Sequence, residues 1–213
     1  MLSPLSVLLD ILFPENCLGC GRSGGWLCEP CIGRLPQAID NQPSMRGLFD
    51  YQDKRIRAAI HKLKYKRGLR LASTLGVHLA EFVLEDLSEL ALFENMADAI
   101  IVPTPLSRER LRERGFNQSE LLAEVVSGIT GLPLSTEVLA KTKHTAPQVS
   151  LKDRRSRQNN LSGAFTIIQP EIIKNKSVIL IDDVYTTGAT ASEIMKTLGA
   201  AGARYCITYT IAH

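Results

Sequence analysis

Four of the five cysteines lie close together near the N-terminus, in two Cys-x2-Cys pairs separated by seven residues: Cys17, Cys20, Cys28 and Cys31. A Cys-x2-Cys turn directs two thiolates at one point, and four thiolates form the closed tetrahedral site that structural zinc favours. So short a segment cannot bury a core of its own, and a metal ion is expected to hold it together. We therefore predict a structural zinc site. The spacing leaves an iron–sulfur cluster open as an alternative.

A second chemically distinctive segment is residues 178–190, where an apolar run ends in two acids and is followed by hydroxyls, a glycine and a helix. Ligands of open α/β sheets bind beyond the carboxyl ends of the strands, where a helix N-terminus offers free N–H groups to an anion. No Gly-Lys-Ser/Thr follows, so this is not the loop of a nucleotide triphosphatase. The residues predicted to hold a phosphate are Thr186, Thr187, Gly188, Ala189 and Thr190.

Asp182 and Asp183 stand directly before this loop. Two adjacent carboxylates repel a phosphate rather than bind it, but they suit the hydroxyl groups of a sugar or a hydrated Mg²⁺ ion. A phosphate on the loop and a sugar on the acids together describe a site for a ribose 5-phosphate.

These groups must be positioned by alternating strands and helices. Apolar, β-branched runs predict strands at residues 47–51, 99–102, 177–181 and 205–211, with 137–143 as a further candidate. Helical spacing and capping signals predict helices at residues 1–15, 54–66, 69–92, 117–130 and 187–198. This alternation indicates an α/β domain with a largely parallel sheet flanked by helices. We assign residues 45–213 to this domain, and residues 1–44 to an N-terminal helix with the zinc-binding module.

Composition and charge exclude several classes of protein. The 213 residues are 45% hydrophobic and 22% charged, with a formal net charge of +3, which is typical of a globular protein. No apolar run approaches the roughly 20 residues of a membrane-spanning helix. The N-terminus lacks the basic start of a signal peptide, so we expect a cytoplasmic protein with reduced cysteines. Charge is unevenly spread: Lys54–Arg70 holds eight basic residues and no acid, and Glu81–Asp98 holds six acids and no base.

Residues 178–190 resemble the signature that binds 5-phosphoribosyl 1-diphosphate (PRPP) in type I phosphoribosyltransferases, a strand followed by Asp-Asp and then Thr-Thr-Gly-x-Thr. Two further motifs, Pro103-Thr-Pro-Leu106 and Arg114-Gly-Phe-Asn-Gln118, stand between the cysteine pairs and this signature. In this order, over nearly the whole chain, the motifs resemble the ComF family of bacterial competence proteins, of the ComFC type. The resemblance implies a zinc-binding module joined to a phosphoribosyltransferase domain, and a role in DNA uptake during natural transformation.

The resemblance also implies roles for particular residues. Asp182 and Asp183 would hold the ribose hydroxyls, with Mg²⁺ bridging to the diphosphate. As the candidate catalytic residues, they would stabilise the oxocarbenium-like state when the C1–O bond breaks. A flexible loop within Lys143–Gly163, rich in Lys and Arg, would close over PRPP. The loop that contacts the diphosphate would consist of Pro103, Thr104, Pro105, Leu106 and Ser107.

Three hypotheses about function stay open at this point: a phosphoribosyltransferase with an unidentified acceptor, a non-catalytic PRPP sensor, and a module that binds single-stranded nucleic acid. In the last case Lys54–Arg70 would follow single-stranded DNA, while Trp26 and Tyr65 stack on its bases. Other competence proteins, such as a helicase, are expected as partners. Four arginines follow the diphosphate loop and spread around a helix, so only some can face the site: Arg108, Arg110, Arg112 and Arg114.

Overall fold

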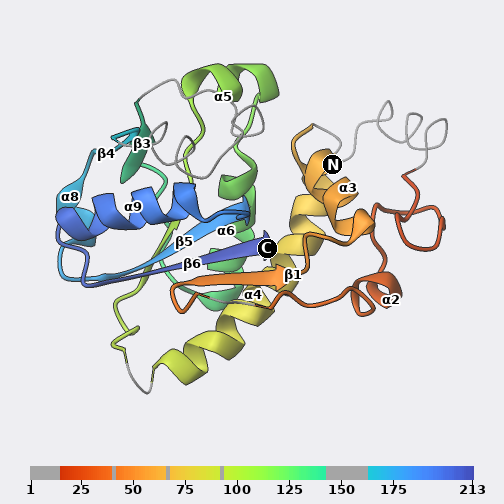
Figure 1. Ribbon diagram of the computed structural model, residues 1–213, viewed down its shortest axis with the longest axis horizontal. Helices are drawn as coiled ribbons and strands as arrows, with labels where there is room; N and C mark the ends of the chain where they lie inside the picture. Colours follow the sequence, from red (N-terminus) through yellow and green to blue (C-terminus); the bar gives the residue numbers. More distant parts are fainter. Residues whose placement is uncertain (1–14, 40–41, 66–67, 92–93, 143–162) are drawn as a thin grey trace.

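The computed structural model describes residues 15–39, 42–65, 68–91, 94–142 and 163–213. A four-stranded sheet lies at its centre (Figure 1). The strands follow the order β1-β6-β5-β2 and are all parallel; they are β1 (Met45–Phe49), β2 (Ile100–Pro103), β5 (Ser177–Val184) and β6 (Tyr205–Ala212). The predicted α/β fold with a parallel sheet is confirmed.

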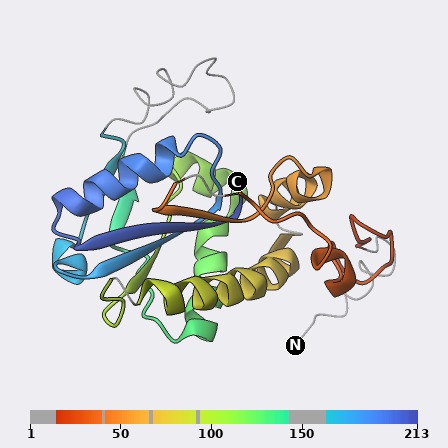
Figure 2. The ribbon, with the colours of Figure 1, turned by 60° about the horizontal axis from the view of Figure 1, so that its bottom comes forward.

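Helices cover both faces of this sheet. Helices α4 (Leu69–Leu90) and α6 (Gln118–Thr130) lie on one face and α9 (Ala189–Ala200) lies on the other, as Figure 2 shows. Strand β5 packs against both layers: Ile179 and Ile181 belong to the core beside α4 and α6, and Val178 and Leu180 to the core beside α9. A strand buried on both faces needs an apolar side chain at every position, which explains the unbroken apolar run in the sequence.

The remaining elements surround the sheet. Helix α3 (Lys54–Leu63) lies beyond the carboxyl ends of the strands, toward which the arrowheads of β1 and β6 point in Figure 1. Helix α5 (Arg108–Arg114) follows β2, and β3 (Leu139–Lys141) pairs antiparallel with β4 (Phe165–Ile167). Two short helices are α2 (Glu29–Ile32) and α8 (Pro170–Ile173). In the part of the chain described here, no helix is long and apolar enough to cross a lipid bilayer.

The cysteine-bearing segment packs directly on the α/β domain. Its buried residues Leu27, Ile32 and Leu35 belong to the same apolar core as residues of α3 and α4. Glu29 Oε2 lies 3.2 Å from His78 Nε2, so α2 contacts the middle of α4. The segment therefore shares a core with its neighbour, and the division into two domains at residue 44 stays a prediction.

Several predicted boundaries differ from the structure. Strand β1 begins and ends two residues earlier than the predicted 47–51. Strand β5 continues to Val184, so Asp182 and Asp183 belong to the strand rather than follow it. Helix α3 ends at Leu63 instead of residue 66, which makes Lys64 its C-cap. The predicted helix at 1–15 lies outside the described residues, except for Glu15. The sequence did not predict α2, α8 or β4, because elements of 3 or 4 residues are too short to show a period. The helix expected for the four arginines is α5, for which no bounds were predicted.

Candidate functional site

A cleft of about 680 Å³ opens at the carboxyl edge of the sheet. Its walls come from the ends of β5 and β6, the segment after β2, helix α5, the end of α3 and the start of α9. Pro103 lies buried as the last residue of β2, and the lining begins at Thr104. Every other residue predicted for the phosphate and diphosphate loops lines this cleft, as do both acids: Thr104, Pro105, Leu106, Ser107, Asp182, Asp183, Thr186, Thr187, Gly188, Ala189 and Thr190.

Gly188 sets the geometry of the loop that leads from β5 into α9. It is the N-cap of α9 and has a left-handed φ of +70°. A Cβ atom at this position would lie 2.8 Å from Met45 Sδ on β1. No side chain caps the helix there, and Ala189, Thr190 and Ala191 of its first turn line the cleft, so N–H groups of this turn are available to an anion.

Asp182 and Asp183 differ in their surroundings although they are adjacent. Oδ1 of Asp182 accepts hydrogen bonds from Ser119 Oγ (2.9 Å), on the first turn of α6, and from the backbone N of Asp183 (2.8 Å). Burial and the neighbouring charge of Asp183 raise the pKa of Asp182 well above its ordinary value. Asp183 is 6% exposed, and its Oδ2 lies 3.4 Å from Lys64 Nζ. Asp183 thus faces a cation, whereas Asp182 faces two hydrogen-bond donors.

Three buried polar atoms at the cleft have no hydrogen-bond partner among the described residues: Thr104 Oγ1, Asp183 Oδ2 and Thr208 Oγ1. Lys64 Nζ is within ion-pair distance of Asp183 Oδ2 but is not aligned for a hydrogen bond. Buried polar groups are paired in most folded proteins, so three exceptions in one cleft indicate a polar ligand that would pair them. Thr208 lies inside the apolar strand β6, and nothing in the local sequence marks it as a site residue.

Basic side chains give the cleft a positive wall. Arg110 and Arg114 line it, together with Lys64 and Lys141. The prediction that only some of the four arginines face the site is confirmed, because Arg108 and Arg112 instead line an adjoining cavity of about 610 Å³. Residues four apart share one face of a helix, which explains this division. Burial, with the charge of Arg110, lowers the pKa of Lys141.

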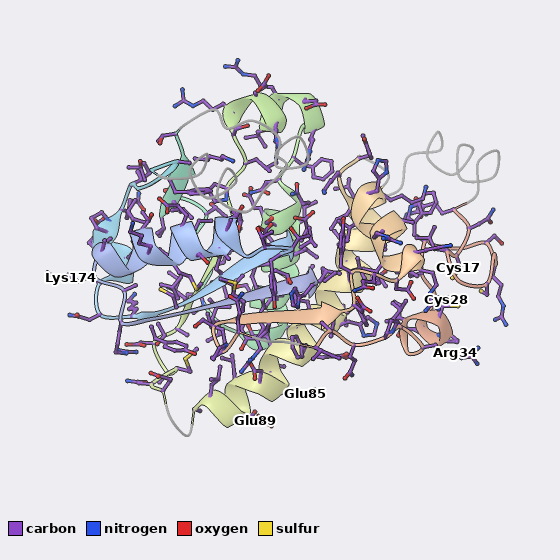
Figure 3. The ribbon with its side chains drawn as sticks, in the orientation of Figure 1. Cys17, Cys28, Arg34, Glu85, Glu89 and Lys174 are labelled. Atoms are coloured by element: carbon purple, nitrogen blue, oxygen red, sulfur yellow. The ribbon has the colours of Figure 1, made fainter. Side chains whose placement is uncertain are left out.

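Among the described residues of the basic stretch Lys54–Arg70, Lys62 and Lys64 face different parts of the molecule. Lys62 Nζ lies 3.6 Å from the centre of the Trp26 ring, so one face of that ring is already covered. Lys64 points into the cleft, while Tyr65 is 59% exposed. Of the two aromatic residues predicted to stack on bases, Tyr65 has the more accessible ring. On the acidic stretch, Glu85 and Glu89 lie on the outer part of α4 (Figure 3).

The loop predicted to close over the ligand lies outside the described residues, which omit 143–162. Its two ends are described. Lys141 lines the cleft, and Gly163 N donates a hydrogen bond to Glu193 Oε1 on α9 (2.7 Å). The described chain therefore stops just after β3, whose Lys141 lines the cleft, and resumes just before its partner strand β4.

The four cysteines near the N-terminus form a cluster beside α2, where Figure 3 labels Cys17 and Cys28. All four Sγ atoms lie within 4.8 Å of one another, and Cys28 Sγ is 3.6 Å from Cys17 Sγ and 3.7 Å from Cys20 Sγ. A tetrahedral ion with metal–sulfur bonds of about 2.3 Å has ligands about 3.8 Å apart. The cysteines predicted to bind metal are thus together, at distances that fit a single ion.

The backbone around these cysteines stabilises a thiolate and leaves room for the sulfur atoms. Burial alone would raise the pKa of Cys17, but N–H groups of Cys20, Cys28 and Gly19 stabilise its thiolate and lower the pKa to about 6. Gly19 allows the close approach, since a Cβ atom there would lie 2.7 Å from Cys31 Sγ.

The curated proteins similar in sequence to this chain carry names that refer to DNA utilization or competence. No family model matches the chain. DNA utilization protein YhgH of Escherichia coli (strain K12) is 33% identical over 199 residues, which cover 92% of this chain and 84% of the relative. Competence protein ComFC of Streptococcus pneumoniae is 29% identical over 198 residues (92% and 80%), and Competence protein F of Haemophilus influenzae is 38% identical over 105 residues (48% and 44%).

Among solved structures, the allosteric regulatory enzyme of purine biosynthesis aligns with a TM-score of 0.44 at 17% identity, over 70% of this chain. This chain spans 29% of the length of that enzyme.

A parallel sheet with an acidic pair and a threonine-rich loop at its carboxyl edge places the protein in the class of α/β folds with a cleft beyond the carboxyl ends of the strands. Here a four-cysteine segment packs beside it. The sequence relatives specify the family further: the chain belongs to the ComF family, together with DNA utilization protein YhgH and the competence proteins. The resemblance stated from the sequence motifs is confirmed.

Proposed function

We propose that the protein binds PRPP in the cleft at the carboxyl edge of the sheet, and that this binding serves DNA uptake. The observation that carries the proposal is the coincidence, in one cleft, of the threonine loop, the acidic pair and three unpaired polar atoms. The names of the relatives, which refer to DNA utilization and competence, support the biological role.

In the proposed complex, each chemical group of PRPP contacts a different set of residues in the cleft. The 5-phosphate would bind Thr186–Thr190 at the N-terminus of α9, where hydroxyls and N–H groups meet. The ribose hydroxyls would donate to Asp182 and Asp183. The diphosphate would lie against the loop from Thr104 to Ser107, close to Arg110 and Arg114. Mg²⁺, when bound, would neutralise the diphosphate and ease its departure.

Two versions of this function differ in chemistry. In a phosphoribosyltransferase the C1–O bond breaks, the diphosphate leaves with the bond electrons, and the carboxylates stabilise the positive ribose ring until an acceptor attacks C1. In a sensor the same complex forms without bond cleavage and biases a conformation or a partner surface. The release of diphosphate separates these two versions.

We propose that the four cysteines hold a structural zinc ion. Thiolate ligands are soft, and four of them leave no open position for substrate. The sulfur–sulfur distances support a single ion, because the cysteine sulfurs of an iron–sulfur cluster are distributed over two or more iron atoms and do not all lie this close to one another.

The experiment is calorimetric titration of the full chain with PRPP and Mg²⁺, followed by thermal unfolding. At 100 times the dissociation constant, the ligand should stabilise the protein by about 2.7 kcal/mol. For a chain of this size that is a rise in Tm of roughly 5–11 °C. Asp183→Ala and Thr187→Ala should each remove most of this rise. Thr197→Ala is the matched control, because Thr197 lies on α9 away from the cleft and donates to Glu193 O.

The same variants test the role in DNA uptake. In a naturally competent host whose own copy is deleted, the wild-type gene and the Thr197→Ala gene should restore transformation, and the Asp183→Ala gene should not. Equal PRPP binding by the wild type and both cleft variants would refute the site. Normal transformation of the deletion strain would refute the role in DNA uptake and leave PRPP binding to be judged by the titration.

A further inference from the structure

A second cavity, of about 610 Å³, adjoins the cleft and has no part in the proposed function. It lies between α5 and the paired strands β3 and β4, and both Ser107 and Lys141 line it as well as the cleft. The other described residues that line it are Arg108, Glu109, Arg112, Ala140, Thr142 and Ile168. Pockets for small ligands have volumes of about 300–1,000 Å³, so this cavity is large enough for a ligand of its own.

Helix α5, which forms one wall of this cavity, lies at the periphery of the molecule (Figure 1), and none of its 7 residues is buried. A helix this short gains little stability from its own hydrogen bonds and normally depends on packed side chains. Its four arginines form two pairs at i and i+4, Arg108 with Arg112 and Arg110 with Arg114. Like charges at this spacing repel each other. Helix stability therefore does not explain this sequence, whereas an anion beside each pair would offset the repulsion.

The arginine pair that faces the second cavity is available to such an anion. The guanidinium groups of Arg108 and Arg112 have no hydrogen-bond or ion-pair partner among the described residues. Burial, with the charge of Arg110, lowers the pKa of Lys141, so the positive charge of this lysine also lacks compensation. Two guanidinium groups on one helix face can each donate two hydrogen bonds to a phosphate.

Charge and apolar surface together indicate the kind of ligand. Three basic residues and one acid line the cavity, a net charge of +2 when all are ionised. A phosphate monoester carries about −1.5 to −2 charges near pH 7, which matches this balance, whereas each phosphodiester of a nucleic-acid strand carries only one. Ile168, just after β4, is a large apolar side chain that is 55% exposed on the cavity wall. A ligand that joins a phosphate monoester to a flat ring would bind the arginines and cover this isoleucine.

We propose that the second cavity binds a nucleoside monophosphate, in addition to the ligand of the cleft. Its phosphate pairs with Arg108 and Arg112, and its base lies against Ile168 and Ala140. The inference goes beyond the proposed function and does not require PRPP to bind.

The position of the cavity argues against an acceptor for phosphoribosyl transfer. In the proposed complex the diphosphate lies against the loop that ends at Ser107, so the second cavity adjoins the leaving group. An acceptor approaches C1 from the face opposite to the leaving group. The nucleotide is therefore a separate ligand, and Ser107 and Lys141 connect its cavity with the cleft.

The test is photolabelling of the full chain with 8-azidoadenosine 5′-monophosphate, followed by mass spectrometry of the labelled peptides. This nucleotide contains a ribose 5-phosphate and can also enter the cleft, so the position of the label distinguishes the two sites. For the wild type we expect label on the segment that contains Ile168. For the double variant Arg108→Gln/Arg112→Gln, half-maximal labelling of this segment should need at least about tenfold more nucleotide, because two charged hydrogen-bond donors are lost.

Two matched variants control for overall charge and for the cleft. Lys54→Gln/Arg57→Gln removes the same two charges from exposed positions on α3 that line neither cavity, and it should be labelled like the wild type. Thr187→Ala should reduce label in the cleft and leave the label at the Ile168 segment unchanged. If the arginine double variant does not fold, Ile168→Glu provides the comparison, because a negative charge on the exposed cavity wall should weaken the same label.

The outcomes separate this inference from the proposed function. Label confined to the cleft, loss of the Ile168 label in Thr187→Ala, or equal labelling of the wild type and the arginine variant would overturn the inference. A single-stranded oligodeoxynucleotide that displaces this label where adenosine 5′-monophosphate does not would assign the cavity to a nucleic-acid strand and overturn it too. Failure of PRPP to bind in the calorimetric titration would refute the proposed function and leave the second site to be judged by its label.

Discussion

Replacing Gly188 with alanine tests the geometry of the loop at the start of α9. Its φ of +70° lies in the left-handed region, where a residue with a Cβ atom costs roughly 1–2 kcal/mol more than glycine. The new Cβ atom would also lie 2.8 Å from Met45 Sδ, and Met45 is only 2% exposed, so its side chain has little room to move. Overpacking of a core costs typically 1–3 kcal/mol. We therefore expect a loss of about 2–5 kcal/mol in the free energy of unfolding.

Gly199→Ala is the matched control on the same helix. Gly199 lies in the last turn of α9, and a Cβ atom there would meet nothing within 4 Å. Alanine is favoured over glycine in a helix by about 0.5–1 kcal/mol, so this variant should be slightly more stable than the wild type.

Urea denaturation measures both effects, and ribose 5-phosphate titration of the folded variants measures the consequence for the site. The two substitutions should shift the midpoint in opposite directions, and only Gly188→Ala should weaken ligand binding. A Gly188→Ala protein as stable as the wild type would show that the positive φ and the contact with Met45 do not constrain this loop.

Two further predictions concern the metal and the acidic pair. Purified protein should contain about one zinc ion per chain by elemental analysis. Cys28→Ser should lose the ion and destabilise the N-terminal segment, because metal binding contributes directly to folding at such sites, whereas the control Cys206→Ser should keep the metal. Full zinc content in Cys28→Ser would contradict the site. Asp182→Asn should keep both hydrogen bonds to Oδ1. It should gain thermal stability relative to the wild type as pH rises from about 4, the ordinary pKa of an aspartate, through the raised pKa of the folded Asp182, because over this range the wild type must take up a proton when it folds. A stability difference that does not change with pH would argue against the raised pKa.

Local signals explain why much of the site could be predicted. The Cys-x2-Cys spacing determines which sulfurs meet, and strand, acidic pair, threonine loop and helix follow one another without interruption between residues 178 and 190. The residues that bind together are thus neighbours in sequence, and the chain itself keeps them close in space. The same holds for the parallel sheet, whose apolar runs at β2 and β5 are buried on both faces.

Contacts between distant segments could not be predicted in this way. Lys64 reaches Asp183 only because α3 lies beyond the carboxyl edge of the sheet, and no pattern between residues 54 and 70 specifies where that helix packs. Lys62 has the same residue type and lies two positions earlier, yet it faces Trp26 instead. The basic stretch was interpreted as one surface because sequence shows charge but not direction. Thr208 was missed for a related reason, since a threonine in a strand is more often a packing residue than a ligand-binding one.

The unpaired polar groups of the cleft lower the stability of the free protein, and their location in one cleft suggests that they serve ligand binding. Leaving a buried polar atom without a partner costs about 1–3 kcal/mol, and a raised pKa at an acid is likewise a cost of holding its charge in the folded state. Scattered through the core, such features would only lower stability. Here the unpaired atoms and the acid with the raised pKa belong to Thr104, Thr208 and the acidic pair. All of these residues line the cleft at the carboxyl edge of one sheet, as does Gly188. A ligand with hydroxyl groups and a phosphate would form hydrogen bonds with these unpaired atoms when it binds. The free energy that the free protein loses by leaving them unpaired would then contribute to the affinity for the ligand.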